Sequence, residues 1–133
     1  MRVGLDTSVV LRLLIGEPQR QAQAAWQAVV EIRAEGGEAV VSDLVVSETY
    51  FALQHHYAVP KREALRQLEA LFESGDLVPA GCAARVLATP RLAAAKPGFV
   101  DRMIHAGYVS NLDQMLSFEK AARKLLRTRV LEG

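Results

Sequence analysis

Short apolar runs alternate with longer segments of helical periodicity along this chain of 133 residues. The apolar runs are rich in valine and leucine, which is typical of buried strands. The longer segments place apolar residues three or four positions apart, which predicts amphipathic helices. The pattern predicts strands over residues 2–5, 39–41, 77–79, 115–118 and 129–131, and helices over 9–15, 18–35, 43–58, 60–74, 82–95, 99–109 and 119–126.

The alternation of strands and helices predicts how the chain is connected. Strands that are separated by helical segments indicate crossover connections between parallel strands. We therefore expect an α/β fold in three layers, α/β/α, with a central, mostly parallel sheet of four or five short strands. No linker divides the sequence, so we expect a single domain over residues 1–133.

Composition and charge exclude several classes of protein. Half of the residues are hydrophobic and 23% are charged, which supports a folded core and excludes a disordered chain. The single cysteine, Cys82, excludes a disulfide framework and a zinc site built on cysteines. A net charge of +1 argues against nucleic-acid binding by bulk charge alone, but it does not exclude a local basic face. No apolar stretch approaches the roughly 18 residues of a membrane span, so we expect a cytoplasmic protein without a membrane partner.

Four acidic residues lie within or directly beside segments that are otherwise apolar. Asp6 directly follows the first strand, and Glu119 directly follows the strand at 115–118. Asp101 opens a helix, and Glu48 has apolar neighbours three and four positions away on its own helix. Because the carboxyl ends of parallel strands meet at one edge of a sheet, we expect Asp6 and Glu119 to leave the sheet at the same edge.

Each of these four residues also has a structural interpretation. Asp6 can cap a helix, because aspartate is favoured at that position. Asp101 and Glu119 can complement helix dipoles in a first turn. Glu48 can pair with a buried arginine such as Arg12.

Taken together, the four carboxylates favour a cation site. Like charges that converge on one sheet edge repel each other and destabilise the fold unless a cation lies between them. Mg²⁺ prefers oxygen ligands and takes one or two carboxylates directly, with water completing its octahedron. Such a site can activate water and stabilise a phosphoryl transition state.

The segments around these acids resemble the sequence blocks of PIN-domain ribonucleases. Residues 4–14 resemble the opening block, and residues 42–53 resemble the second block, whose glutamate belongs to the metal site. Residues 98–106 resemble the third block, which is centred on an aspartate. Residues 116–120 resemble the fourth, although Glu119 stands where aspartate is more usual. The blocks occur in the family's order, and the length is similar to that of VapC-type toxins of toxin–antitoxin pairs.

The resemblance implies an endoribonuclease that uses Mg²⁺ or Mn²⁺. Asp6, Glu48 and Asp101 would hold the metal, and Glu119 would complete the acidic cluster. Ser8 would orient a carboxylate or a water molecule, although a first-turn hydroxyl that bonds to backbone is an equal alternative. The implied partners are an RNA substrate, a VapB-like antitoxin and a second copy in a homodimer. The alternative is a catalytically inert PIN-fold binding module, to which the glutamate at position 119 gives weight.

Basic residues and a histidine near the end of the sequence are further candidates. His105 lies four positions after Asp101, where a metal or general-base role competes with the favoured interpretation of a partly buried structural histidine. The late basic residues can contact phosphates beside the scissile one, or they can form a solvated face. They are Arg102, Lys120, Arg123, Lys124, Arg127 and Arg129.

Overall fold

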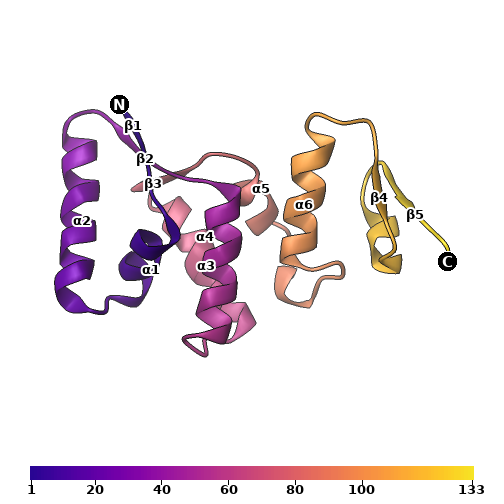
Figure 1. Cartoon of the computed structure of the whole chain (residues 1–133), viewed down its shortest axis with the longest axis horizontal. Helices are drawn as coiled ribbons and strands as arrows, with labels where there is room; N and C mark the ends of the chain where they lie inside the picture. The colour runs from indigo at the N-terminus through magenta and orange to yellow at the C-terminus, as the bar shows by residue number, and fades with distance from the viewer.

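Five short strands and six α-helices alternate in the computed structural model, which describes residues 1–133 (Figure 1). The first half of the chain contains β1 (Arg2–Gly4), α1 (Thr7–Ile15), α2 (Gln19–Ala34), β2 (Glu38–Val41), α3 (Asp43–His55) and α4 (Lys61–Glu73). The second half contains β3 (Leu77–Pro79), α5 (Ala83–Leu87), η1 (Leu92–Ala94), α6 (Phe99–Val109), β4 (Met115–Ser117), η2 (Lys120–Lys124) and β5 (Thr128–Val130). The predicted α/β fold, with helices around parallel strands, is confirmed.

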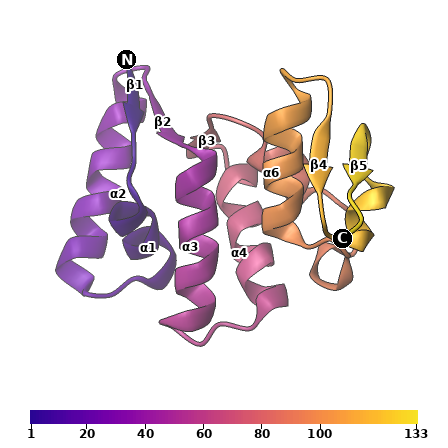
Figure 2. The same ribbon diagram turned by 45° about the vertical axis from the view of Figure 1, so that its right-hand side comes forward.

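The strands form two separate sheets. One sheet has the order β1-β2-β3, and the other contains β4 and β5 alone. All three pairings are parallel. Figures 1 and 2 show β4 and β5 at the opposite end of the molecule from β1, with α3 and α6 between them. The five predicted strands are therefore present, but they are not joined in one sheet.

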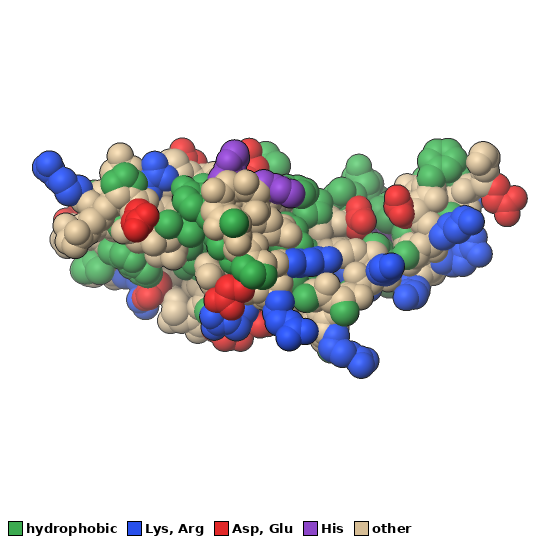
Figure 3. Space-filling model, turned by 90° about the horizontal axis from the view of Figure 1, so that it is seen from below, with side chains coloured by type: hydrophobic (Ala, Val, Ile, Leu, Met, Phe, Trp, Pro, Cys, Tyr) green, Lys and Arg blue, Asp and Glu red, His purple; other side chains and the backbone are tan.

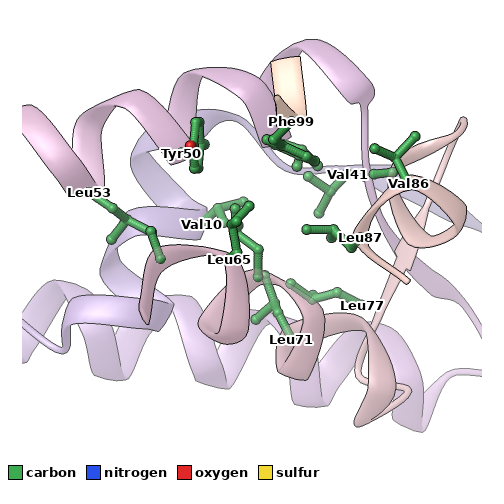
Figure 4. Packing of buried hydrophobic residues seen from close by; sticks show 14 of the residues in the cluster. Val10, Val41, Tyr50, Leu53, Leu65, Leu71, Leu77, Val86, Leu87 and Phe99 are labelled. Carbon is green, nitrogen blue, oxygen red and sulfur yellow. The ribbon is translucent and has the colours of Figure 1, made fainter. Parts of the chain in front are cut away.

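The hydrophobic core explains this arrangement. A cluster of 22 buried residues joins the first sheet to helices α1 to α6 (Figure 4). Phe99 at the start of α6 is 1% exposed, and its ring meets the ring of Tyr50 on α3 edge-on, with centroids 4.9 Å apart. Met103 and Ala106, also on α6, are buried in the same cluster. Helix α6 is thus anchored beside α3 and α5, away from β1.

The segment after α6 contributes little to this core. We call residues 115–130, which contain β4, η2 and β5, the C-terminal arm. Its buried residues Met115 and Ala122 lie outside the main cluster. The arm is therefore held to the rest of the chain through α6.

Two predicted helices differ from those in the structure. The helix expected over 82–95 is divided into α5 and the 3₁₀ turn η1. Pro90 lies between them, and proline has no N–H to continue a helix. The helix expected over 119–126 is the short 3₁₀ segment η2. By contrast, α3 begins as predicted, because the Ser42 hydroxyl accepts a 3.2 Å hydrogen bond from the Val45 N–H.

Candidate metal centre

Asp6 lies at the carboxyl end of β1 and caps helix α1. Its Oδ1 accepts a 2.6 Å hydrogen bond from the Ser8 hydroxyl and a 3.2 Å bond from the Val9 N–H. These two bonds, with the Ser8 bond the stronger cause, hold the pKa of the Asp6 carboxyl below its ordinary value. The side chain is exposed, and its Oδ2 has no partner in the chain. The predicted capping role is confirmed, and it leaves an ionised oxygen free for a ligand.

Glu48 joins Asp6 through Thr7. The Thr7 hydroxyl donates a 2.7 Å hydrogen bond to Oε1 of Glu48, which brings α3 against the start of α1. Glu48 is exposed and makes no ion pair with Arg12, whose Nε donates to Gln21 instead. The expectation of a buried Glu48–Arg12 pair is therefore wrong. We call Asp6 and Glu48 the first acidic pair.

Asp101 and Glu119 form a second acidic pair, on the side of α6 that faces the C-terminal arm. Both line a cavity of about 280 Å³ between α6 and the C-terminal arm. Asp101 lies in the first turn of α6, and Glu119 follows β4, where its N–H donates a 2.9 Å hydrogen bond to the Ser117 hydroxyl. Neither carboxylate accepts a hydrogen bond or an ion pair from the chain.

The four carboxylates stand as two pairs and not as one cluster. No group of three or more histidine, cysteine, aspartate or glutamate side chains is placed to hold a metal ion. The separation follows from the fold, because β1 and β4 belong to different sheets. Each pair nevertheless offers two hard oxygen donors, and Mg²⁺ takes one or two carboxylates beside water. The donor chemistry of each pair therefore fits a magnesium or manganese ion.

One acidic residue has a role that the sequence did not indicate. Asp43 lies in the first turn of α3, and its Oδ1 accepts bonds from the backbone N–H groups of Cys82 at 3.0 Å and Ala83 at 3.2 Å. A Cβ atom on Gly81 would collide with the Asp43 carboxylate. These residues lie about 40 positions apart in the sequence, so no local pattern connects them. Asp43 ties the start of α3 to the start of α5.

A basic hollow lies on the other side of α6 from the second acidic pair. This cavity of about 390 Å³ is lined by Arg85, Arg102, His105 and Arg127, and by no carboxylate. Arg102 donates to the Pro97 carbonyl over 2.7 Å, while His105 Nε2 lies 2.6 Å from the carbonyl oxygen of Leu126. The structural interpretation of His105 is therefore supported. Figure 3 shows Lys and Arg side chains gathered over the middle and right-hand end of one face, toward the C-terminal arm.

Comparisons with known proteins identify a family. A family model described as "PIN domain" matches residues 3–107, from β1 into α6. The matched range contains Asp6, Glu48 and Asp101 and ends before Glu119. No curated protein and no solved structure gives a significant match to the chain. None of the helices has the length and apolar character that crossing a membrane requires.

Proposed function

Because this chain belongs to the PIN-domain family, whose members are generally nucleases, we propose that it is a metal-dependent endoribonuclease that cleaves RNA phosphodiester bonds. The first acidic pair is the observation that supports this proposal most. Asp6 stands at the carboxyl end of a parallel strand with a lowered pKa, and Glu48 is held beside it by Thr7. Two exposed carboxylates at this position are suited to a divalent cation.

We propose Asp6, Glu48, Asp101 and Glu119 as the residues that hold Mg²⁺ or Mn²⁺. When bound, the metal would supply a water of lowered pKa and positive charge beside the phosphate oxygens. Ser8 acts as a positioning residue, because its hydroxyl fixes Oδ1 of Asp6 and leaves Oδ2 directed elsewhere. Thr7 fixes Oε1 of Glu48 in the same way. The two hydroxyls thus orient the first acidic pair without covering it.

The basic hollow supports RNA as the substrate class. Three arginines share a cavity that contains no carboxylate, so their positive charge is available to an anion. The hollow and the second acidic pair flank the same helix, α6, on which Arg102 directly follows Asp101. An RNA strand whose scissile phosphate lies at the acids can therefore place a neighbouring phosphate at the arginines.

Cleavage of a labelled RNA with Mg²⁺ or Mn²⁺ tests the activity. Asp6→Asn keeps the shape of the side chain and its bond from Ser8 but removes the charge. We expect Asp6→Asn and Asp101→Asn each to lower the cleavage rate by about 100-fold or more. Asp113→Asn, in an exposed turn without a hydrogen bond, is the matched control and should cleave normally. Undiminished cleavage by Asp6→Asn would overturn the mechanism.

We further propose that the enzyme is the toxin of a VapBC-type toxin–antitoxin pair. The resemblance of the sequence blocks and the length of the chain support this role. The expected partner is a VapB-like antitoxin, and the expected result of expression without it is arrested growth in a bacterial host. Growth arrest that persists in Asp6→Asn would contradict toxicity through RNA cleavage.

A catalytically inert PIN-fold binding module is the second candidate function. The observation that favours it is the separation of the four acids into two pairs. Thermal unfolding with and without Mn²⁺ distinguishes the two functions, since a ligand that binds only the folded state raises the melting temperature. If the chain is a metal-dependent endoribonuclease, Mn²⁺ should raise the melting temperature, and Asp6→Asn should abolish this rise. If the chain is an inert binding module, millimolar Mn²⁺ should leave the melting temperature unchanged.

A further inference from the structure

A cavity of about 460 Å³ lies between α4 and the turn that leads into η1. Three arginines line it: Arg62 and Arg66 on α4, and Arg91 directly before η1. Its floor is formed by buried leucines, which are Leu65, Leu87 and Leu92. We call this cavity the α4 hollow. It combines a rim of positive charge with an apolar floor, and no residue of the acidic pairs lines it.

Two of these arginines have a free charge. Arg62 and Arg91 are exposed, and neither forms an ion pair within the chain. Arg66 differs, because its Nε donates a 2.9 Å hydrogen bond to Glu63 on the same helix. Arg91 also has a left-handed backbone, with φ of 52°, a strained conformation that occurs most often at functional sites. The charges of Arg62 and Arg91 are therefore available to an anion from outside the chain.

The α4 hollow adjoins the basic hollow beside α6. Thr89 lines both cavities, with Arg85 four positions before it in the basic hollow and Arg91 two positions after it in the α4 hollow. Figure 3 shows one face on which Lys and Arg side chains extend from the middle of the molecule toward the C-terminal arm. We call the two adjoining hollows the basic track. The track leads from α6, which carries Asp101, to the start of α4.

We propose that the basic track binds the part of a single-stranded RNA that extends beyond the scissile phosphate. This inference rests on the proposed function, because it extends the RNA contact assigned to the basic hollow. Phosphates would lie first at the basic hollow and then at Arg62 and Arg91 of the α4 hollow. Positively charged grooves that follow the backbone are typical of proteins that bind single strands. The substrate class is therefore a single strand long enough to reach from α6 to α4.

The lining of the track favours a single strand over a duplex. Apolar side chains lie among the arginines in both hollows. Unpaired bases are free to turn toward an apolar surface, whereas a duplex keeps its bases stacked inside. Contacts to phosphates position the RNA but carry no direct information on its sequence. The track should therefore raise the affinity for long single strands without selecting the sequence that is cleaved.

A carboxylate limits the track at its α4 end. Glu69 lines the α4 hollow and shares one face of α4 with Arg62 and Arg66. Glu69 and Glu73 also line the next cavity, of about 280 Å³, which contains no basic residue. Because these carboxylates repel phosphate groups, we expect the RNA to leave the surface at Glu69.

The salt dependence of binding tests the track without relying on cleavage. A labelled single strand of about 16 nucleotides is titrated in EDTA, so that no metal-dependent cleavage occurs. We expect the double variant Arg62→Gln, Arg91→Gln to make the slope of log affinity against log salt shallower by about 1.4. Lys61→Gln is the matched control, because Lys61 is exposed beside Arg62 but lines neither hollow. A slope for the double variant equal to that of Lys61→Gln would overturn the proposal, as would an equal loss on a blunt duplex of the same length.

A variant that gains affinity excludes damage to the fold as the explanation. Glu69→Gln removes the repelling charge at the end of the track and should strengthen binding of the same single strand about threefold. Glu35→Gln makes the same change at the end of α2, outside both hollows, and should leave the affinity unchanged. Unchanged or weaker binding by Glu69→Gln would overturn the path along α4.

Cleavage kinetics separate this inference from the proposed function. An RNA of about 4 nucleotides is too short to extend to the α4 hollow from the acids, whereas one of about 16 should reach it. We expect the double variant Arg62→Gln, Arg91→Gln to raise KM for the longer RNA about 20-fold at 0.1 M salt, with kcat unchanged, and to leave both constants unchanged for the shorter RNA. Equal losses on both lengths would overturn the track. If the unmodified chain cleaves neither RNA, the proposed function fails, and the salt slopes still decide whether the track binds RNA.

Discussion

The Thr7 hydroxyl donates a 2.7 Å hydrogen bond to Oε1 of Glu48 across 41 positions of sequence. This bond joins the residue after Asp6 to the middle of α3. It is the only hydrogen bond that the Glu48 carboxylate accepts within the chain. Glu48 is exposed and has no basic partner. The position of the first acidic pair therefore depends on a hydroxyl that does not itself need to touch a metal.

Removal of the Thr7 hydroxyl should weaken metal binding. Thr7→Val keeps the branched shape but cannot donate to Glu48, so the carboxylate is free to rotate away. We expect the dissociation constant for Mn²⁺, measured by calorimetry, to rise about tenfold, as for other groups that orient metal ligands. Thr7→Ser keeps a hydroxyl and should restore most of the affinity. Equal affinities for Thr7→Val and the unmodified chain would show that the bond does not position Glu48.

Ser8 should set the pH at which Asp6 takes up a proton. The Ser8 hydroxyl is the main cause that lowers the Asp6 pKa below its ordinary value of 3.8. A carboxyl whose pKa is lowered on folding stabilises the folded state above the unfolded pKa, and this stabilisation is lost as the pH falls through the folded pKa. Ser8→Ala should raise the Asp6 pKa toward 3.8, measured from the carboxyl ¹³C shift in an NMR titration. An unchanged titration of Asp6 would contradict the assigned cause.

Asp43 should contribute to stability rather than to cleavage. Its carboxylate accepts the N–H groups of Cys82 and Ala83, and hydrogen bonds to a charged group are worth roughly 1.5–3 kcal/mol. We expect Asp43→Ala to lower the free energy of unfolding in urea by about 2 kcal/mol. Asp43→Asn keeps an accepting oxygen and should lose less. Asp113→Ala removes an exposed carboxylate without a partner and serves as the control. A loss equal to that of the control would show that the bonds to α5 add nothing.

Local patterns predicted the elements of the fold but not their assembly. All five strands follow the apolar runs, and α6 begins at Phe99 as the sequence indicates. Strand pairing depends on contacts between distant segments, and no periodicity shows which edge the fourth strand joins. The free edge of β1 and the separate β4–β5 sheet could therefore not be predicted from the sequence.

The sequence suggested candidate site residues but did not predict their arrangement in space. The position of Asp6 after a strand correctly indicated a helix cap. Apolar neighbours suggested that Glu48 is buried, but Leu44 and Phe51 are themselves exposed, so the helix face is uncovered and not part of the core. An apolar stripe on a helix predicts that another surface covers it. The sequence alone does not show whether that surface belongs to the same chain.

Arg85 should contact RNA through the basic hollow. Its guanidinium is exposed and makes only a 3.5 Å contact to the Cys82 sulfur, so it is the least engaged of the arginines that line the cavity. Each phosphate contact to a single strand contributes about −0.7 to the slope of log affinity against log salt. We expect Arg85→Gln to weaken binding of a non-cleavable single-stranded RNA and to make this slope shallower by about 0.7. Arg20→Gln carries the same charge change on α2, at the end of the molecule away from α6, and should leave the slope unchanged (Figure 1). Equal slopes for the two variants would place the RNA elsewhere on the surface.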